Sequence, residues 1–297
     1  MNTKNIVLGL IFGLLLTLQT SAQGLLDGFT PKKGDLSITA SYTSSNYEKF
    51  YAGTTKMDAV PAHNEIDQNI YSIYAKYGIT NKLSVVLNAP YISAEGNGIA
   101  DPFNGTTEQD GFQDISIGLK YNAYSLNFNK FNLDVITGLS VDIPTDYEAN
   151  GILSLGNNTF STNLTAGLHL QNDAGFFATF LNSYQFKGDA DNTAGGNDFD
   201  VPNAYYATTK IGYASSFIYV EGWLDYLASK DGVDISDSTF VGNFPETKVE
   251  YTRIGATIYK NIIPELGASV GVSSVIDGRN IGKSTNYTVG LTYNLNI

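Results

Sequence analysis

The chain has 297 residues, no cysteine and a formal net charge of −12. The absence of cysteine excludes disulfides, thiol catalysis, cysteine-based metal sites and a lipoprotein anchor. The acidic balance, without any basic stripe, argues against a nucleic-acid partner. No linker of distinct composition divides the sequence, so we expect a single folded domain after the N-terminal region.

The N-terminus has the pattern of a secretory signal peptide. Lys4 is a short positive region, residues 6–18 are apolar, and small residues precede Gln23. The apolar run is too short to span a bilayer, which indicates a cleaved signal and not an anchor. The predicted organisation is a signal peptide at 1–22, a short periplasmic N-terminal segment at 23–33 and a barrel at 34–297.

From residue 34 onward the sequence alternates strand patterns with turns. In residues 286–295, apolar or aromatic side chains occupy every odd position and small or polar residues every even position. Successive side chains of a strand point to opposite faces, so this strand has one apolar and one polar face. Twelve strands are predicted, at 35–45, 67–79, 82–93, 111–124, 130–143, 159–171, 175–187, 203–214, 216–228, 247–260, 265–277 and 284–297. Only the strand at 175–187 is ambiguous, because both of its faces are half apolar.

The connections between these strands alternate in length. Short turns follow the even-numbered strands and longer loops follow the odd-numbered ones. This asymmetry predicts an all-β fold, a single antiparallel transmembrane β-barrel with short periplasmic turns and longer extracellular loops. An even number of strands closes such a sheet and removes its exposed edges. An exported soluble sandwich is the alternative, but the loop asymmetry and the aromatic residues near strand ends favour the barrel.

The polar face of the strands is expected to line the lumen, because ionisable groups facing lipid are costly. The candidate lumen-lining residues are Lys76, Asp114, Lys120, Lys210, Glu221, Trp223, Asp225 and Arg253. Their mixed signs indicate paired charges in a narrow wet lumen, whereas a strongly ion-selective pore would show one sign. The alternative is that these residues only brace the wall. Trp223 either stacks on a ring-shaped solute or fills space.

Signals for catalysis or metal binding are scarce. His63 and His169 are the only histidines, and no G-x-S-x-G, P-loop or H-E-x-x-H motif occurs. We therefore predict no catalytic residue, no metal and no cofactor. Acids at 189–200 resemble a calcium loop in their spacing, but Ala194 occupies the position that requires glycine. Solvated loops account for the acidic residues equally well.

Three blocks carry a family resemblance: residues 76–83 leading to 89–91, residues 111–121 and residues 138–145. In this order they resemble outer-membrane transporters of the phenol-degradation (MetA-pathway) family. The resemblance implies a medium-sized barrel that passes small molecules, aromatic or hydrophobic ones among them. Two departures from the family pattern leave open whether this chain shares the family's substrate. Asp146 follows Pro-Thr where glycine is frequent, and the chain ends in Ile297 instead of phenylalanine.

The leading hypothesis is a passive channel in the outer membrane of a Gram-negative-type envelope, with no enzymatic activity. Its expected partners are outer-membrane lipid, a small-molecule solute and, during biogenesis, the barrel-assembly machinery. The alternatives are a structural or surface-interaction barrel and an outer-membrane hydrolase that uses His63 or His169. The segment at 23–33 is too short for a plug domain, so a plug would be an inward-folded loop at 187–201 or 229–247. The sequence leaves open the solute, the open or plugged state, the oligomeric state and calcium binding by the loops.

Overall fold

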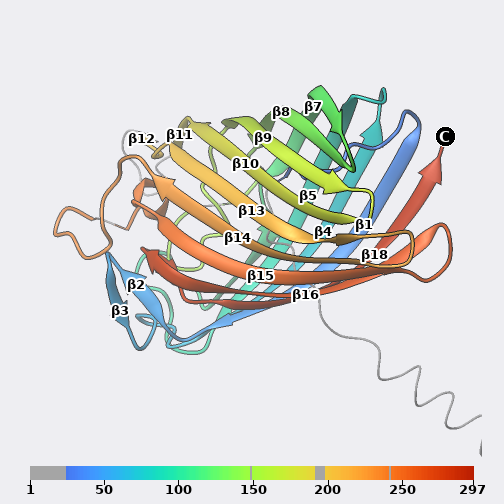
Figure 1. Ribbon diagram of the computed structural model, residues 1–297. Coiled ribbons are helices and arrows are strands. Elements are labelled where there is room, and N and C mark those ends of the chain that lie inside the picture. Colours follow the sequence, from blue (N-terminus) through green and yellow to red (C-terminus); the bar gives the residue numbers. More distant parts are fainter. Residues whose placement is uncertain (1–24, 148, 191–197, 241) are drawn as a thin grey trace, which may run out of the picture.

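The computed structural model describes residues 25–147, 149–190, 198–240 and 242–297, and its strands form a closed antiparallel barrel (Figure 1). Closure is made by β1, which pairs with β18 on one side and with β4 on the other. The barrel strands are β1 (Asp35–Tyr47), β4 (Ile66–Gly78), β5 (Leu83–Gly96), β7 (Ile115–Phe128), β8 (Phe131–Ile143), β9 (Ser161–Asn172), β10 (Phe176–Lys187), β13 (Ala204–Ala214), β14 (Tyr219–Ser229), β15 (Glu250–Asn261), β16 (Leu266–Arg279) and β18 (Thr285–Asn296).

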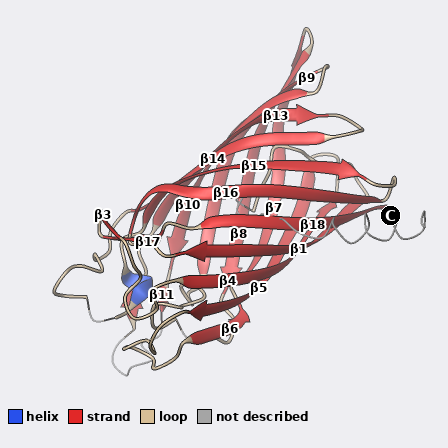
Figure 2. Ribbon diagram, turned by 90° about the horizontal axis from the view of Figure 1, so that it is seen from below, coloured by secondary structure: helices blue, strands red, loops and turns tan. Residues whose placement is uncertain are grey.

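Short elements of secondary structure lie at one end of the barrel, together with the long loops (Figure 2). They are β2 (Phe50–Ala52), β3 (Thr55–Met57), β6 (Glu108–Phe112), β11 (Asp189–Ala190), β12 (Phe199–Asp200), β17 (Ile281–Gly282) and the 3-10 helix η1 (Phe244–Glu246). Among the described residues, no helix is long and apolar enough to cross a membrane.

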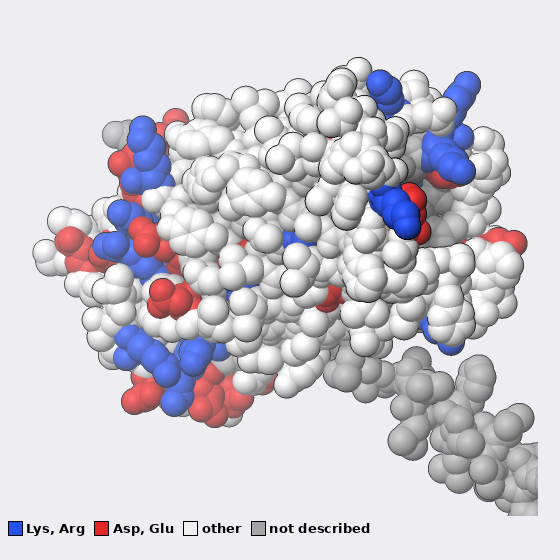
Figure 3. Space-filling view, viewed as in Figure 1, with Lys and Arg blue, Asp and Glu red and all other residues white. Residues whose placement is uncertain are grey.

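The strands expose their apolar side chains and bury their polar ones. In β7, Ile117, Leu119 and Tyr121 are exposed, while Gly118 and Lys120 between them are buried. A soluble barrel would show the opposite arrangement, because its apolar face would be turned inward. The space-filling view shows the result as a largely uncharged band that separates charged residues at the two ends (Figure 3). This band is the surface that a transmembrane barrel presents to lipid.

Each of the twelve predicted strands overlaps one barrel strand of the structure. The largest difference is at 111–124, where the barrel strand begins only at Ile115 and a separate strand, β6, precedes it. Gln113 and Asp114 interrupt the pattern between them. The ambiguous strand, β10, turns Phe177 and Leu181 inward and Phe180 outward.

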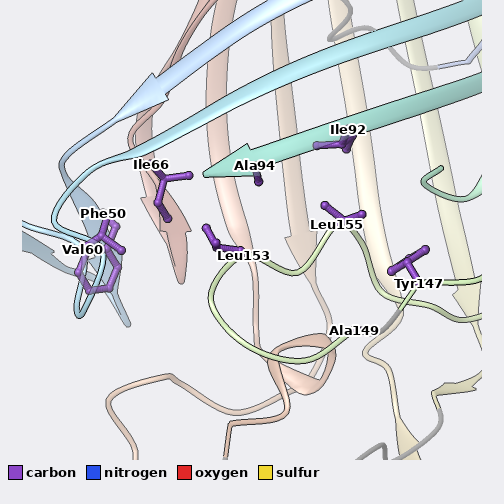
Figure 4. Close-up of a cluster of buried hydrophobic side chains, with 9 residues drawn as sticks. All are labelled: Phe50, Val60, Ile66, Ile92, Ala94, Tyr147, Ala149, Leu153 and Leu155. Carbon is purple, nitrogen blue, oxygen red and sulfur yellow. The ribbon is translucent and has the colours of Figure 1, made fainter. Parts of the chain in front are cut away.

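A hydrophobic cluster packs two long loops against β4 and β5 at the extracellular end (Figure 4). Its members are Phe50, Val60, Ile66, Ile92, Ala94, Tyr147, Ala149, Leu153 and Leu155. Beside it, the buried Asp101 accepts a hydrogen bond from the Ile152 backbone and lies 3.6 Å from Nε2 of the buried His63. These contacts fix the loops over the strand ends, so the extracellular mouth has a packed rim.

Candidate functional site in the barrel lumen

The chain segment that precedes β1 lies inside the barrel. Asp27 is bound by two inward-facing lysines: Nζ of Lys76 is 2.6 Å from Oδ2, and Nζ of Lys120 is 2.7 Å from Oδ1. Lys120 also donates to the backbone carbonyl of Asp27 at 3.0 Å and to that of Phe29. Because Lys120 is completely buried, a charge partner is needed to offset the loss of its hydration.

Phe29 of the same segment inserts its ring among three aromatic side chains of the wall. The ring centroids lie 4.5 Å from His169, 5.1 Å from Phe177 and 5.9 Å from Tyr219, all in edge-to-face geometry. Edge-to-face contacts are favourable because the ring edge is electropositive and the ring face electronegative. Gly28 makes the approach possible, since a Cβ there would lie 2.2 Å from Nδ1 of His169.

Leucines complete the contact between the segment and the wall. Leu26 is buried against Val86, Ile136 and Leu181 of three different strands. Its side chain also fills the space above Gly138, where a Cβ would lie 2.1 Å from Cδ1 of Leu26. The segment is therefore anchored by apolar, aromatic and ionic contacts at once.

A cavity of about 680 Å³ remains beside the segment. Asp27 and Phe29 lie on its boundary, and one side of it is lined by small hydroxyl side chains of adjoining strands: Ser37, Thr39, Ser41, Thr257, Ser269 and Thr292. Some of these pair across the strands, as Thr39 does with Thr292 at 2.8 Å. Hydroxyl groups both donate and accept hydrogen bonds, so this side of the cavity can replace part of the hydration of a polar solute.

On β13 and β14 the cavity meets a buried ion pair. Lys210 lies 3.8 Å from Glu221, and both side chains are almost completely buried. The Tyr219 hydroxyl donates to Glu221 at 2.5 Å. The two charges therefore neutralise each other within the wall, and this part of the wall does not present a charge of one sign to the cavity.

A second charged group lies on β14 and β15. The Arg253 guanidinium binds the buried Asp225 at 3.0 Å. It also lies over the rings of Trp223 and Tyr251, at 5.6 Å and 5.3 Å from their centroids. Because Arg253 is paired with Asp225 and stacked on aromatic rings, its guanidinium is held in a fixed position at the edge of the cavity.

The predicted lumen residues take several different positions. Lys76, Lys210, Glu221 and Arg253 border the cavity, whereas Lys120, Trp223 and Asp225 are buried in the wall or under the segment. Asp114 lies at the extracellular rim and accepts a hydrogen bond from the Tyr147 hydroxyl at 2.6 Å. Trp223 covers Gly255 of the neighbouring strand, where a Cβ would lie 2.2 Å from the indole. A role for these residues in a solute path stays a prediction.

Asp27 and Phe29 are not among the residues predicted from the sequence. The segment before the barrel was expected in the periplasm, and any plug was expected to be a loop, yet residues 25–29 contact the lumen wall. One signal was available: the register partners of Lys76 and Lys120 on the neighbouring strands are Ser37, Val86, Ser84 and Gly138, and none of them is an acid. Of the loops named as plugs, residues 191–197 lie outside the described residues.

The two histidines lie at opposite ends of the barrel. His63 is in the first extracellular loop beside Asp101, and His169 is near the periplasmic end of β9, 2.7 Å from the Thr179 hydroxyl. They therefore do not form one site. Within the described ranges, no group of three or more potential metal ligands occurs. The signal peptide and part of the proposed calcium loop lie outside the described residues.

The sequence matches a known family over most of its length. Residues 68–289 match the model of the family described as "Putative MetA-pathway of phenol degradation". The chain belongs to this family. The match includes the three blocks on which the resemblance was based, so that resemblance is confirmed.

Solved structures similar to this family member are outer-membrane barrels. The COG4313 outer membrane channel from Pseudomonas putida F1 has a TM-score of 0.74 and 14% identity, covering 93% of this chain and 100% of that chain. A NanC porin has a TM-score of 0.49 and 9% identity, with 88% and 100% covered. The CymD monoaromatic hydrocarbon channel has a TM-score of 0.44 and 10% identity, with 90% and 89% covered. None of the curated proteins matches this sequence.

The COG4313 channel shows that the twelve-stranded barrel is an outer-membrane fold. The family member described here is therefore an outer-membrane β-barrel, in a Gram-negative-type envelope. Its apolar exterior and its charge-paired interior agree with this location.

Proposed function

We propose that the protein is a passive outer-membrane channel for small organic solutes, aromatic ones among them, without enzymatic activity. The observation that carries this proposal is the cavity of about 680 Å³ in a closed barrel, bordered by hydroxyl, aromatic and charged side chains. A solute in this cavity exchanges water for hydroxyl and aryl contacts at each step, so no energy source is required.

The aromatic part of the proposal is supported by the tyrosines around the cavity. Tyr74, Tyr206, Tyr219, Tyr251 and Tyr259 all border it. A tyrosine offers a ring face for stacking and a hydroxyl for hydrogen bonding, which suits a solute that has both a ring and a polar group. The family description is consistent with such solutes.

Liposome swelling with the full mature chain tests the proposal, and β1 provides a matched pair of variants. Thr39 borders the cavity, and its neighbour Ala40 is exposed on the outer face. We expect Thr39→Trp to slow the uptake of a small aromatic alcohol severalfold, whereas Ala40→Trp leaves uptake unchanged. If neither the wild type nor any variant passes a solute, the protein is not a channel, and a structural or surface-interaction role replaces the proposal.

A further inference from the structure

We infer that the wall contacted by Asp27, Gly28 and Phe29 is a binding site for aryl carboxylates, and that these three residues now occupy the place of such a ligand. This inference rests on the proposed channel function and names the chemical class of solute that the lumen selects. It follows from three properties of the contacted wall: its charge, its aromatic side chains and the spacing between the two.

The charge of the wall favours an anion. Lys76 and Lys120 both bind the single carboxylate of Asp27, at 2.6 Å and 2.7 Å. In the described part of the chain, no other carboxylate lies within ion-pair distance of either lysine. When the segment leaves, both ammonium groups lose their ionic partner, and Lys120 also loses the residues that cover it. Since two unpaired cations then lie close together in a narrow lumen, a carboxylate solute would be favoured there over a neutral one.

The second part of the site favours a flat ring. His169, Phe177 and Tyr219 all make edge-to-face contacts with the Phe29 ring, at centroid distances of 4.5 to 5.9 Å. His169 is held in place by Thr179, whose hydroxyl lies 2.7 Å from Nδ1. A saturated ring of similar volume would bury the same area but would lose the favourable edge-to-face interaction with these aromatic side chains. The wall therefore distinguishes aryl from saturated rings.

The spacing between the two parts defines the ligand further. Asp27 and Phe29 are separated by one glycine, and the Phe29 amide donates to Oδ1 of Asp27 at 3.0 Å, which folds carboxylate and ring into a compact turn. Gly28 lies against His169, with no room for a side chain. The matching solute is therefore an aromatic ring joined to a carboxylate by a short, slender chain.

The site is accessible from the remaining lumen. Asp27, Phe29 and Lys76 all border the cavity, and the Asp27 side chain is 30% exposed. A solute in the cavity therefore meets the edge of the ion pair before the segment has moved. Competition between solute and segment for the same two lysines follows from this geometry.

The test uses the full mature chain with Asp27→Asn and Phe29→Ala combined, which weakens the segment and leaves the wall intact. Block of single-channel current is measured with 3-phenylpropanoate, its neutral amide and 3-cyclohexylpropanoate. We expect the aryl carboxylate to block at about tenfold lower concentration than either analogue, the effect of one charged or aromatic contact. Adding Lys76→Met should reduce that preference, whereas Lys260→Met, at the periplasmic end over Phe217, should not.

Two results would overturn the inference. One is equal block by the carboxylate and its amide, and the other is a preference of unchanged size after Lys76→Met. In either case, if neutral solutes still enter liposomes, the proposed channel function stands without this site. If no solute passes and no current is seen, the channel function fails and the inference fails with it.

Discussion

Lys120 binds the carboxylate of Asp27 at 2.7 Å, although the two residues are 93 positions apart in the sequence. One lies on a barrel strand and the other on the segment before the first strand. Their contact joins this segment to the barrel wall through one ion-pair network. The network joins a buried lysine, a mostly buried lysine and one carboxylate, so the removal of the carboxylate affects both cations.

Replacing Asp27 by alanine should therefore loosen the segment and enlarge the path. We expect single-channel conductance to rise severalfold, because the lysines lose the partner that holds residues 25–29 against the wall. Asp35→Ala is the matched control: Asp35 is at the start of β1, outside the cavity lining, and accepts hydrogen bonds from the Lys32 amide and Asn296. An unchanged conductance in Asp27→Ala would mean that the leucine and phenylalanine contacts alone hold the segment.

Gly28→Ala tests the steric part of the same attachment. The new Cβ would lie 2.2 Å from Nδ1 of His169 and 2.6 Å from the Thr179 hydroxyl, so the segment must move away from the wall. We expect a higher conductance with an unchanged barrel, as judged by β-sheet circular dichroism. Gly222→Ala is the control, because a Cβ there meets nothing closer than 4.0 Å. Equal conductance in the two variants would contradict the close packing of Gly28.

The strands were predictable because their signal is local. The alternation of apolar and polar residues identifies a strand and its two faces from about ten neighbouring positions. In β18, Tyr287, Val289 and Leu291 are apolar in the sequence and lie on the face opposite Thr288, which is buried. The loop asymmetry then fixed the sidedness, and the family blocks agreed with it.

The interior could be predicted only in part. The alternation of apolar and polar residues along each strand places Lys76, Lys120 and Arg253 inward, but it does not say what these side chains contact. The partner of the two lysines lies in a segment with no periodicity, so no local pattern connects them. The partner of Arg253 is different: Asp225 is its register neighbour on the adjacent strand, a pairing that strand alignment alone supplies.

The ion pair between Asp234 and Arg279, in the loops at the extracellular end, predicts a pH dependence of stability. Two hydrogen bonds from Arg279, at 2.8 Å and 2.6 Å, hold the pKa of Asp234 at about 2, below its ordinary value of 3.8. A depressed pKa means that the stabilisation is complete above about pH 4 and is lost as pH falls toward 2. The difference in melting temperature between wild type and Asp234→Asn should therefore shrink between pH 5 and pH 2. A constant difference in melting temperature over that range would show that the ion pair between Asp234 and Arg279 does not stabilise the fold.

The alternation of residues along each strand predicts which side chains face lipid and which face the lumen. Leu291, near the middle of β18, is 53% exposed on the outer face, and its neighbour Thr292 borders the cavity. Arginine at position 291 should lower the free energy of unfolding in lipid vesicles by about 2–4 kcal/mol, because a charge at mid-membrane depth loses its hydration. Thr292→Arg, with its charge in the wet lumen, should cost much less. If the two variants are equally destabilised in a urea titration, the assignment of the lipid and lumen faces of β18 is wrong.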